Sequence, residues 1–171
     1  ERYEMVYAGK THAEISGESV VSDKMPDIGL LGNTSTQVLL RSKRTETGAA
    51  IMEGDLSFDV CYIPDGAAGL CVLKMQLPWV IEFQSDEISG NHIATGFVRV
   101  VQVETRMLNP RKILVKAKIE GEMRVFNSNS TTIYDAVQAD DMIQVAVEEV
   151  DCNVISTVCE KTFAATDEYP L

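Results

Sequence analysis

The sequence lacks long apolar stretches of the kind that span membranes. Its longest uncharged stretches, such as Ala67 to Leu73, fall far short of the roughly 20 apolar residues that a spanning helix needs. The chain opens at Glu1 without the basic, apolar and small-residue pattern of a signal peptide. We therefore predict no membrane insertion, and we expect a cytosolic protein or, as we favour, an excised piece of a longer one.

Positive charge is also scarce. The 171 residues include 15 Lys and Arg against 26 Asp and Glu, a formal net charge of −11. Such a surface repels nucleic-acid phosphates and anionic lipids, so we expect neither as a partner. With 45% hydrophobic and 24% charged residues the composition is that of a globular chain, and the length suits about one domain.

Cysteine is sparse and widely spaced. Cys61, Cys71, Cys152 and Cys159 fit neither zinc-site spacing nor a dense disulfide framework, which favours reduced thiols in a reducing compartment. Cys61 and Cys71 nevertheless lie symmetrically about Gly66. A hairpin turning there could bring them to bridging distance, so the sequence leaves a disulfide open.

Residues that carry chemistry are equally few. The two histidines, His12 and His92, have no partner at metal-ligand spacing, which predicts surface residues. Nucleophile-elbow, phosphate-loop and zinc-protease motifs are absent. The acidic pairs Asp140-Asp141 and Glu148-Glu149 would diverge on a strand, which favours solvated charge. We predict a protein that is not an enzyme and has no catalytic residue, no cofactor and no metal.

What the sequence does have is period-two alternation. From Arg111 to Val125 the odd positions are mostly apolar and the even ones mostly charged, which predicts a long half-buried strand. Met52 to Tyr62 alternates with an acidic solvent face. Apolar residues also recur at every second position in two further stretches, Leu70 to Phe83 and Ile93 to Met107. Weaker patterns predict strands at 36–47 and 142–150, one helical turn at 135–141 and a loop at 127–132.

These strands predict an all-β fold. About seven strands at hairpin spacing, with no crossover helix, favour an antiparallel β-sandwich or open barrel with long hairpins. Asn109-Pro110 should join two of them tightly, and Pro78 should mark a sheet edge or a bulge. The predicted core includes Leu56, Phe58, Val60, Leu73, Met75, Ile113, Val115 and Ile119.

Aromatic residues allow two interpretations. Trp79 with Tyr62 and Phe83 could form a sugar-stacking platform, but alternate aromatics on a buried strand face favour the core.

One short motif recurs. Ser22-Asp23-Lys24-Met25-Pro26 reappears as Thr166-Asp167-Glu168-Tyr169-Pro170. The motif predicts a bend before a strand, with an exposed docking epitope as the alternative.

Three stretches, Val20–Ile28, Met52–Tyr62 and Val103–Ala117, resemble in that order the SPOCS domain of spore-coat and sporulation-associated proteins of clostridia and related Firmicutes. The resemblance covers about residues 20–126 of a single all-β domain at 1–171. It picks out family-motif residues with a structural role. These are Ser22, Asp23, Pro26, Asp27, Asn109, Arg111 and Lys112.

The closing residues 151–171 resemble the opening of a following tandem copy, and residues 2–7 and 150–163 would then join one copy to the next. The resemblance implies a non-catalytic protein–protein interaction and assembly module in the mother-cell cytoplasm, at the forespore surface and spore coat. Its expected partners are other coat or assembly proteins, or tandem copies of itself. A glycan or cell-wall binding module using Trp79 is the alternative, although the LysM segment that often follows in the family is missing here.

Overall fold

The computed structural model describes residues 2–130 and 153–161. The described part contains six strands and no helix. The strands are β1 (Arg2–Val20), β2 (Ile28–Glu46), β3 (Ala49–Pro64), β4 (Cys71–Gln84), β5 (Ile93–Asn109) and β6 (Lys112–Asn129).

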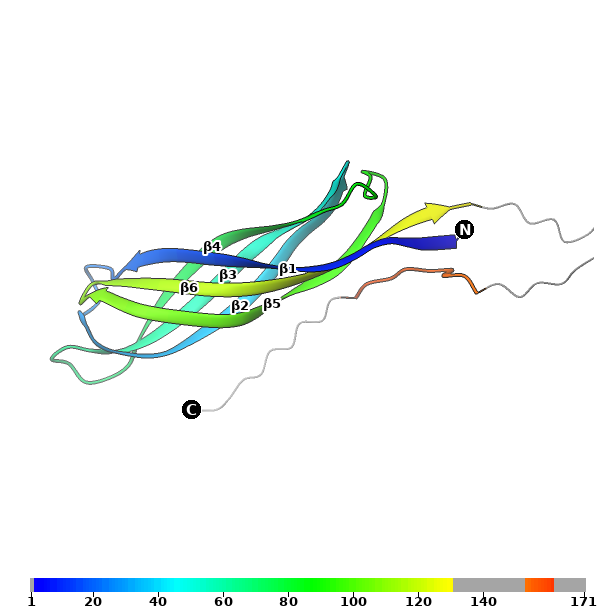
Figure 1. Cartoon of the computed structure of the whole chain (residues 1–171). Coiled ribbons are helices and arrows are strands. Elements are labelled where there is room, and N and C mark those ends of the chain that lie inside the picture. Colours follow the sequence, from blue (N-terminus) through cyan, green and yellow to red (C-terminus); the bar gives the residue numbers. More distant parts are fainter. Residues whose placement is uncertain (1, 131–152, 162–171) are drawn as a thin grey trace, which may run out of the picture.

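The strands form two three-stranded sheets with the orders β1-β6-β5 and β2-β3-β4 (Figure 1). Every neighbouring pair is antiparallel. The sheets also touch along both sides, where β2 meets β5 and β1 meets β4. The all-β prediction is confirmed, and of its two alternatives the structure is the sandwich.

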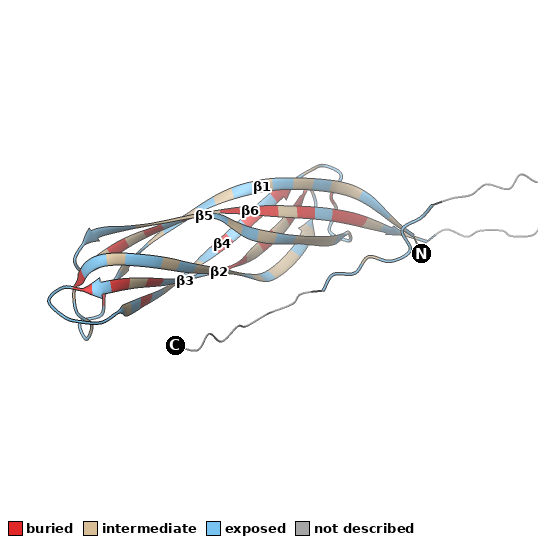
Figure 2. Ribbon diagram, turned by 90° about the horizontal axis from the view of Figure 1, so that it is seen from below, coloured by how far each residue is buried: buried red, intermediate tan, exposed pale blue. Residues whose placement is uncertain are grey.

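The core lies between the two sheets. Most of its members come from alternate positions of the central strands β3 and β6, as the red bands in Figure 2 show, and β4 adds Trp79, Ile81 and Phe83. Seven of the eight predicted core residues are buried, and Met75 is half-buried and packs against the rest. The period-two pattern therefore identified the inward faces of β3, β4 and β6 correctly, because the side chains of a strand alternate between core and solvent. On β5 the pattern is wrong, since its alternating residues Ile93, Phe97 and Val101 are exposed.

β1 is the strand that the sequence pattern did not predict. It pairs with β6 over its whole length, from Arg2 opposite Asn129 to Val20 opposite Lys112. Most of its residues are small or polar, and each position is exposed or only half-buried, although Tyr7 and Ile15 pack against the core. Residues 2–7, predicted to join tandem copies, are thus the beginning of this strand.

Two predicted boundaries are wrong for the same reason. β2 begins at Ile28 rather than at residue 36, and β6 continues to Asn129 through the predicted loop. In both places pairing with a neighbouring strand extends the strand beyond the alternating pattern, since backbone pairing and packing can override weak local preferences.

Pro78 lies on β4, at the edge of its sheet, opposite Asp55. The register between β3 and β4 is continuous, so the edge interpretation is confirmed and the bulge is not. Asn109 and Lys112 close the β5–β6 hairpin through Pro110 and Arg111, which confirms the predicted tight connection.

The hairpin at Gly66 does not align the two cysteines. Tyr62 is opposite Cys71, and Cys61 is opposite Val72. This offset of one residue places the two thiols on opposite faces of the sheet, and both are free. Cys159 is also free, so the disulfide that the sequence left open between Cys61 and Cys71 is not formed.

Several predictions fall outside the described residues. They concern the strand at 142–150, the helical turn at 135–141, Cys152, the two acidic pairs and the second motif copy at 166–170.

Candidate interaction surface

The predicted family-motif residues gather at one end of the sandwich, at the left in Figure 1, where three connections meet. Backbone hydrogen bonds join them. The Val21 amide donates to the Arg111 carbonyl (2.9 Å), the Ile28 amide to the Pro110 carbonyl (2.7 Å), and the Asp65 amide to the Asp27 carbonyl (2.9 Å). The β1–β2 crossover is thereby fixed to both of the hairpin turns beside it.

Arg111 ties this end together with its side chain. Its guanidinium donates to the Val21 carbonyl at 3.0 Å and to Asp27 Oδ1 at 2.5 Å. A longer contact of 3.3 Å reaches Asp23 Oδ1. A planar guanidinium suits this task because its several N–H groups point in fixed directions. Arg111 therefore clamps the crossover between the sheets onto the β5–β6 turn.

Other motif residues make contacts in the same connections between strands. The Asn109 side-chain oxygen accepts from the Arg111 amide at 2.9 Å, and Lys112 forms an ion pair with Glu18. The Ser22 carbonyl accepts from the Met25 amide at 2.8 Å, which closes the turn before Pro26.

Tyr62, which the motif did not include, is completely buried beneath this end. Its hydroxyl donates to the Pro26 carbonyl at 3.1 Å. Burial raises the pKa of Tyr62, and contact with Cys71 raises it further. The neutral hydroxyl is thus the favoured form, and only that form can donate to a carbonyl.

Beside this clamp, the outer face of the β2-β3-β4 sheet carries exposed apolar side chains. Leu30 is opposite Ile63 on adjacent strands, and Val72 is opposite Cys61 two residues further along. Leu70 directly precedes β4. The exposed fractions are 63% for Leu30, 46% for Ile63, 65% for Leu70 and 39% for Val72. We call these four residues the apolar patch.

The surface next to the apolar patch is polar and slightly hollowed. The hollow has a volume of about 480 Å³ and is lined mainly by Ser35, Gln37, Ser57, Asp59, Lys74 and Gln76. A contiguous apolar area with a polar border is typical of a protein–protein contact site.

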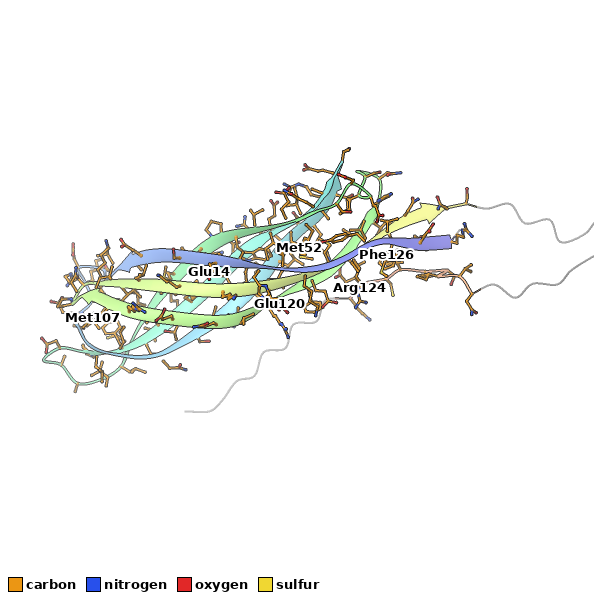
Figure 3. All side chains as sticks on the ribbon, viewed as in Figure 1. Glu14, Met52, Met107, Glu120, Arg124 and Phe126 are labelled. Atoms are coloured by element: carbon orange, nitrogen blue, oxygen red, sulfur yellow. The ribbon has the colours of Figure 1, made fainter. Side chains whose placement is uncertain are left out.

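The opposite outer face, on the β1-β6-β5 sheet, is charged. Glu120 contacts His12 (2.9 Å) and Arg99 (2.5 Å), and Glu122 contacts Lys10 (3.0 Å) and Arg124 (3.1 Å). Hydrogen bonds from these cations, chiefly Arg99 and Lys10, lower the pKa of both carboxyl groups. Figure 3 labels Glu120 and Arg124 along this face.

The histidines have separate surroundings. His12 is exposed, as predicted, but His92 is half-buried in the turn before β5, where its Nδ1 accepts from the Ser89 amide at 3.2 Å. Within residues 2–130 and 153–161 no three His, Cys, Asp or Glu side chains come together as a metal site would require. The same part of the chain has no helix long and apolar enough to cross a membrane.

The three aromatic residues considered for a sugar-stacking platform belong to the core. Trp79 is 3% exposed, Phe83 2% and Tyr62 0%. The core interpretation is therefore confirmed, and these rings do not form a surface platform.

The apolar patch was missed by sequence reasoning. Alternation predicts that the apolar residues of β3 and β4 point inward, and it predicts an acidic solvent face for Met52–Tyr62. Cys61 and Ile63 break that acidic series at its end, after Glu53, Asp55 and Asp59. These two apolar residues at outward positions were the signal in the sequence for an exposed apolar surface.

Comparison with known proteins found no match to this chain among family models, curated proteins or solved structures.

Proposed function

We propose that this chain is a non-catalytic protein–protein interaction and assembly module whose contact surface is the apolar patch. The exposure of Leu30, Ile63, Leu70 and Val72 on neighbouring strands is the observation that carries the proposal. Large apolar side chains in water gain free energy when a partner covers them, at about 25 cal/mol per Å² of apolar area.

The support beneath the patch favours this role. A sheet face with a buried reverse side presents its residues rigidly, so little order is lost when a partner binds. The Arg111 clamp fixes the three connections at the same end. The polar hollow beside the patch supplies a hydrogen-bonding border.

The biological setting is proposed on the SPOCS resemblance alone. It places the module in the mother-cell cytoplasm, at the forespore surface and spore coat, with other coat proteins or tandem copies as partners. The glycan-binding alternative relied on Trp79, and the burial of that ring removes its support.

The test is a pull-down from sporulating cells with the wild-type chain as bait and vegetative cells as the comparison. Leu30→Lys and Val72→Lys place a charge within the apolar patch. Val80→Lys is the matched control, because Val80 is 60% exposed on the same sheet but lies away from the patch.

We expect coat-assembly proteins to be enriched from sporulating cells by wild type and by Val80→Lys. Both patch variants should lose most of that enrichment while keeping the wild-type unfolding midpoint. Equal recovery by the patch variants would contradict the assigned surface, and equal recovery from vegetative cells would contradict the sporulation setting.

A further inference from the structure

A second feature lies at the other end of β2, away from the apolar patch. There Glu160, from residues 153–161 (the orange segment in Figure 1), contacts both β2 and β5. Both oxygens of the Glu160 carboxylate are used. One accepts from the Gly96 amide at 3.1 Å, and the other forms an ion pair with Lys43.

Lys43 lies on the edge strand β2, but its side chain is largely buried. It is opposite Met52, whose side chain is completely buried, so Lys43 points toward the inside of the sandwich and its ammonium group reaches Glu160. Its side chain is only 18% exposed. Burial lowers the pKa of Lys43, so the charged form gains from a carboxylate placed beside it.

Gly96 provides the second donor. It lies on β5, an edge strand, so an amide directed away from β6 has no strand to pair with. A Cβ at this position would collide with the Glu122 carbonyl and with the end of the Met52 side chain. The glycine therefore allows the close packing that sets this amide near the Lys43 ammonium.

The segment that supplies the carboxylate also contacts β1. The Tyr3 amide donates a backbone hydrogen bond to the Ile155 carbonyl at 2.8 Å. Within residues 153–161, Val158 is half-buried and the other residues are exposed. None of them belongs to the buried core. The segment fills a site on a sandwich whose core is already complete.

We propose that Lys43 and the Gly96 amide form a binding site for a carboxylate on an extended peptide, and that segment 153–161 of a second copy of this chain occupies it by exchange. The contacts made within one copy and between two copies are identical, so exchange loses none of them, as in domain swapping. Residues 131–152 connect the segment to β6, and a link of that number of residues can span roughly 70 Å when extended.

This inference goes beyond the proposed function and does not depend on it, because the apolar patch lies at the opposite end of β2. The first experiment measures the site itself. A fluorescein-labelled peptide of residues 153–161 is titrated with the full-length Glu160→Gln protein, whose own segment lacks the carboxylate, and anisotropy is recorded under reducing conditions.

We expect saturable binding that weakens at least about tenfold when the peptide carries Glu160→Gln, the loss typical of one charge-assisted contact. Lys43→Met in the protein should have the same effect. Lys118→Met is the matched control, since it removes a lysine from the outer face of the other sheet, and it should bind like the parent. Equal affinity of both peptides would overturn the site, and this comparison needs no second protein variant to fold.

The second experiment measures exchange by complementation. Full-length Glu160→Gln lacks the ligand, and full-length Lys43→Met lacks the site, so neither should associate with itself. Their mixture restores one intact pair, and native mass spectrometry should show a heterodimer that is absent from either variant alone. A mixture that stays monomeric, or single variants that dimerise equally well, would overturn the exchange between copies.

Discussion

Trp79 shows what a single residue contributes to this sandwich. Its ring is buried, and a Cβ added to Gly54 on the neighbouring strand would press against it, so the ring and the glycine fit closely. Its Nε1 is among the buried polar atoms without a hydrogen-bond partner in the described residues. The residue therefore stabilises the fold through packing rather than through its polar group.

Replacing Trp79 with Ala should destabilise the protein by about 3–5 kcal/mol, because it leaves a large cavity in a packed core. Trp79→Phe should cost clearly less, since it keeps a ring and removes the unpaired N–H. Urea unfolding followed by circular dichroism measures both. A fully stable Trp79→Ala protein would contradict the core assignment.

Arg111 offers a second prediction at this scale. Arg111→Ala removes hydrogen bonds to the Val21 carbonyl and to Asp27, and we expect a loss of about 1–2 kcal/mol after allowance for solvent screening of a side chain that is 36% exposed. Arg111→Lys should recover only part of this, because a lysine cannot reproduce the planar set of donors. Chemical denaturation of the three proteins makes the comparison, and an equal midpoint for all three would rule out the clamp.

At the scale of elements, the two outer faces have different chemistry. The β1-β6-β5 face holds the ion pairs of Glu120 and Glu122, whereas the β2-β3-β4 face carries the apolar patch. Charge on the first face discourages unwanted stacking of sheets. The first face also carries the exposed Phe97, and the second carries the Arg44–Glu53 ion pair. The difference is therefore local to the end of the β2-β3-β4 sheet where the apolar patch lies.

The ion pairs predict an acid dependence. The pKa values of Glu120 and Glu122 are lowered in the folded state, so their contribution to stability is present above their ordinary value of 4.5 and is lost as the pH falls through the depressed folded values. The free energy of unfolding should therefore fall below about pH 4.5.

The double variant Glu120→Gln, Glu122→Gln should show a shallower fall over that range in urea titrations at successive pH values. Lys118→Gln changes the charge of the same face and leaves those four ion pairs intact, so it should follow the wild-type curve. A double variant with the wild-type slope would show that these pairs are not linked to folding.

At the scale of the whole molecule, the pairing of β6 with two other strands sets which part of the chain we expect to fold. It is the central strand of its sheet, with β1 on one side and β5 on the other. A fragment limited to residues 20–126, the region that resembles the SPOCS domain, would lack nearly all of β1. One side of β6 would then have no partner, and a long unpaired strand invites aggregation.

We therefore expect residues 2–130 to unfold in one cooperative transition, because they contain both sheets and the complete buried core. Residues 20–126 should be largely aggregated or unfolded. Size-exclusion chromatography and thermal melts distinguish the two outcomes. A soluble, cooperatively folding 20–126 fragment would show that β1 is dispensable.

The sequence alone determined the all-β class, the inward faces of β3, β4 and β6 and the tight β5–β6 turn. Alternation and turn chemistry are local properties, and they can be read without knowing what lies opposite. The sequence also singled out Asp23, Asp27 and Arg111, although Arg111 lies more than 80 positions from the two aspartates. That selection came from a family resemblance and not from any local pattern.

Tertiary structure decided the rest. β1 is a strand because β6 supplies its hydrogen bonds, and the polar end of β6 is a strand because Arg2 lies opposite Asn129. The register of the β3–β4 hairpin placed Cys61 and Cys71 on opposite faces, a difference of one residue that symmetry about Gly66 does not fix. The apolar patch and the Lys43–Gly96 site each join residues from different strands. Such sites depend on pairing between distant segments, so they exist only once the two sheets have formed.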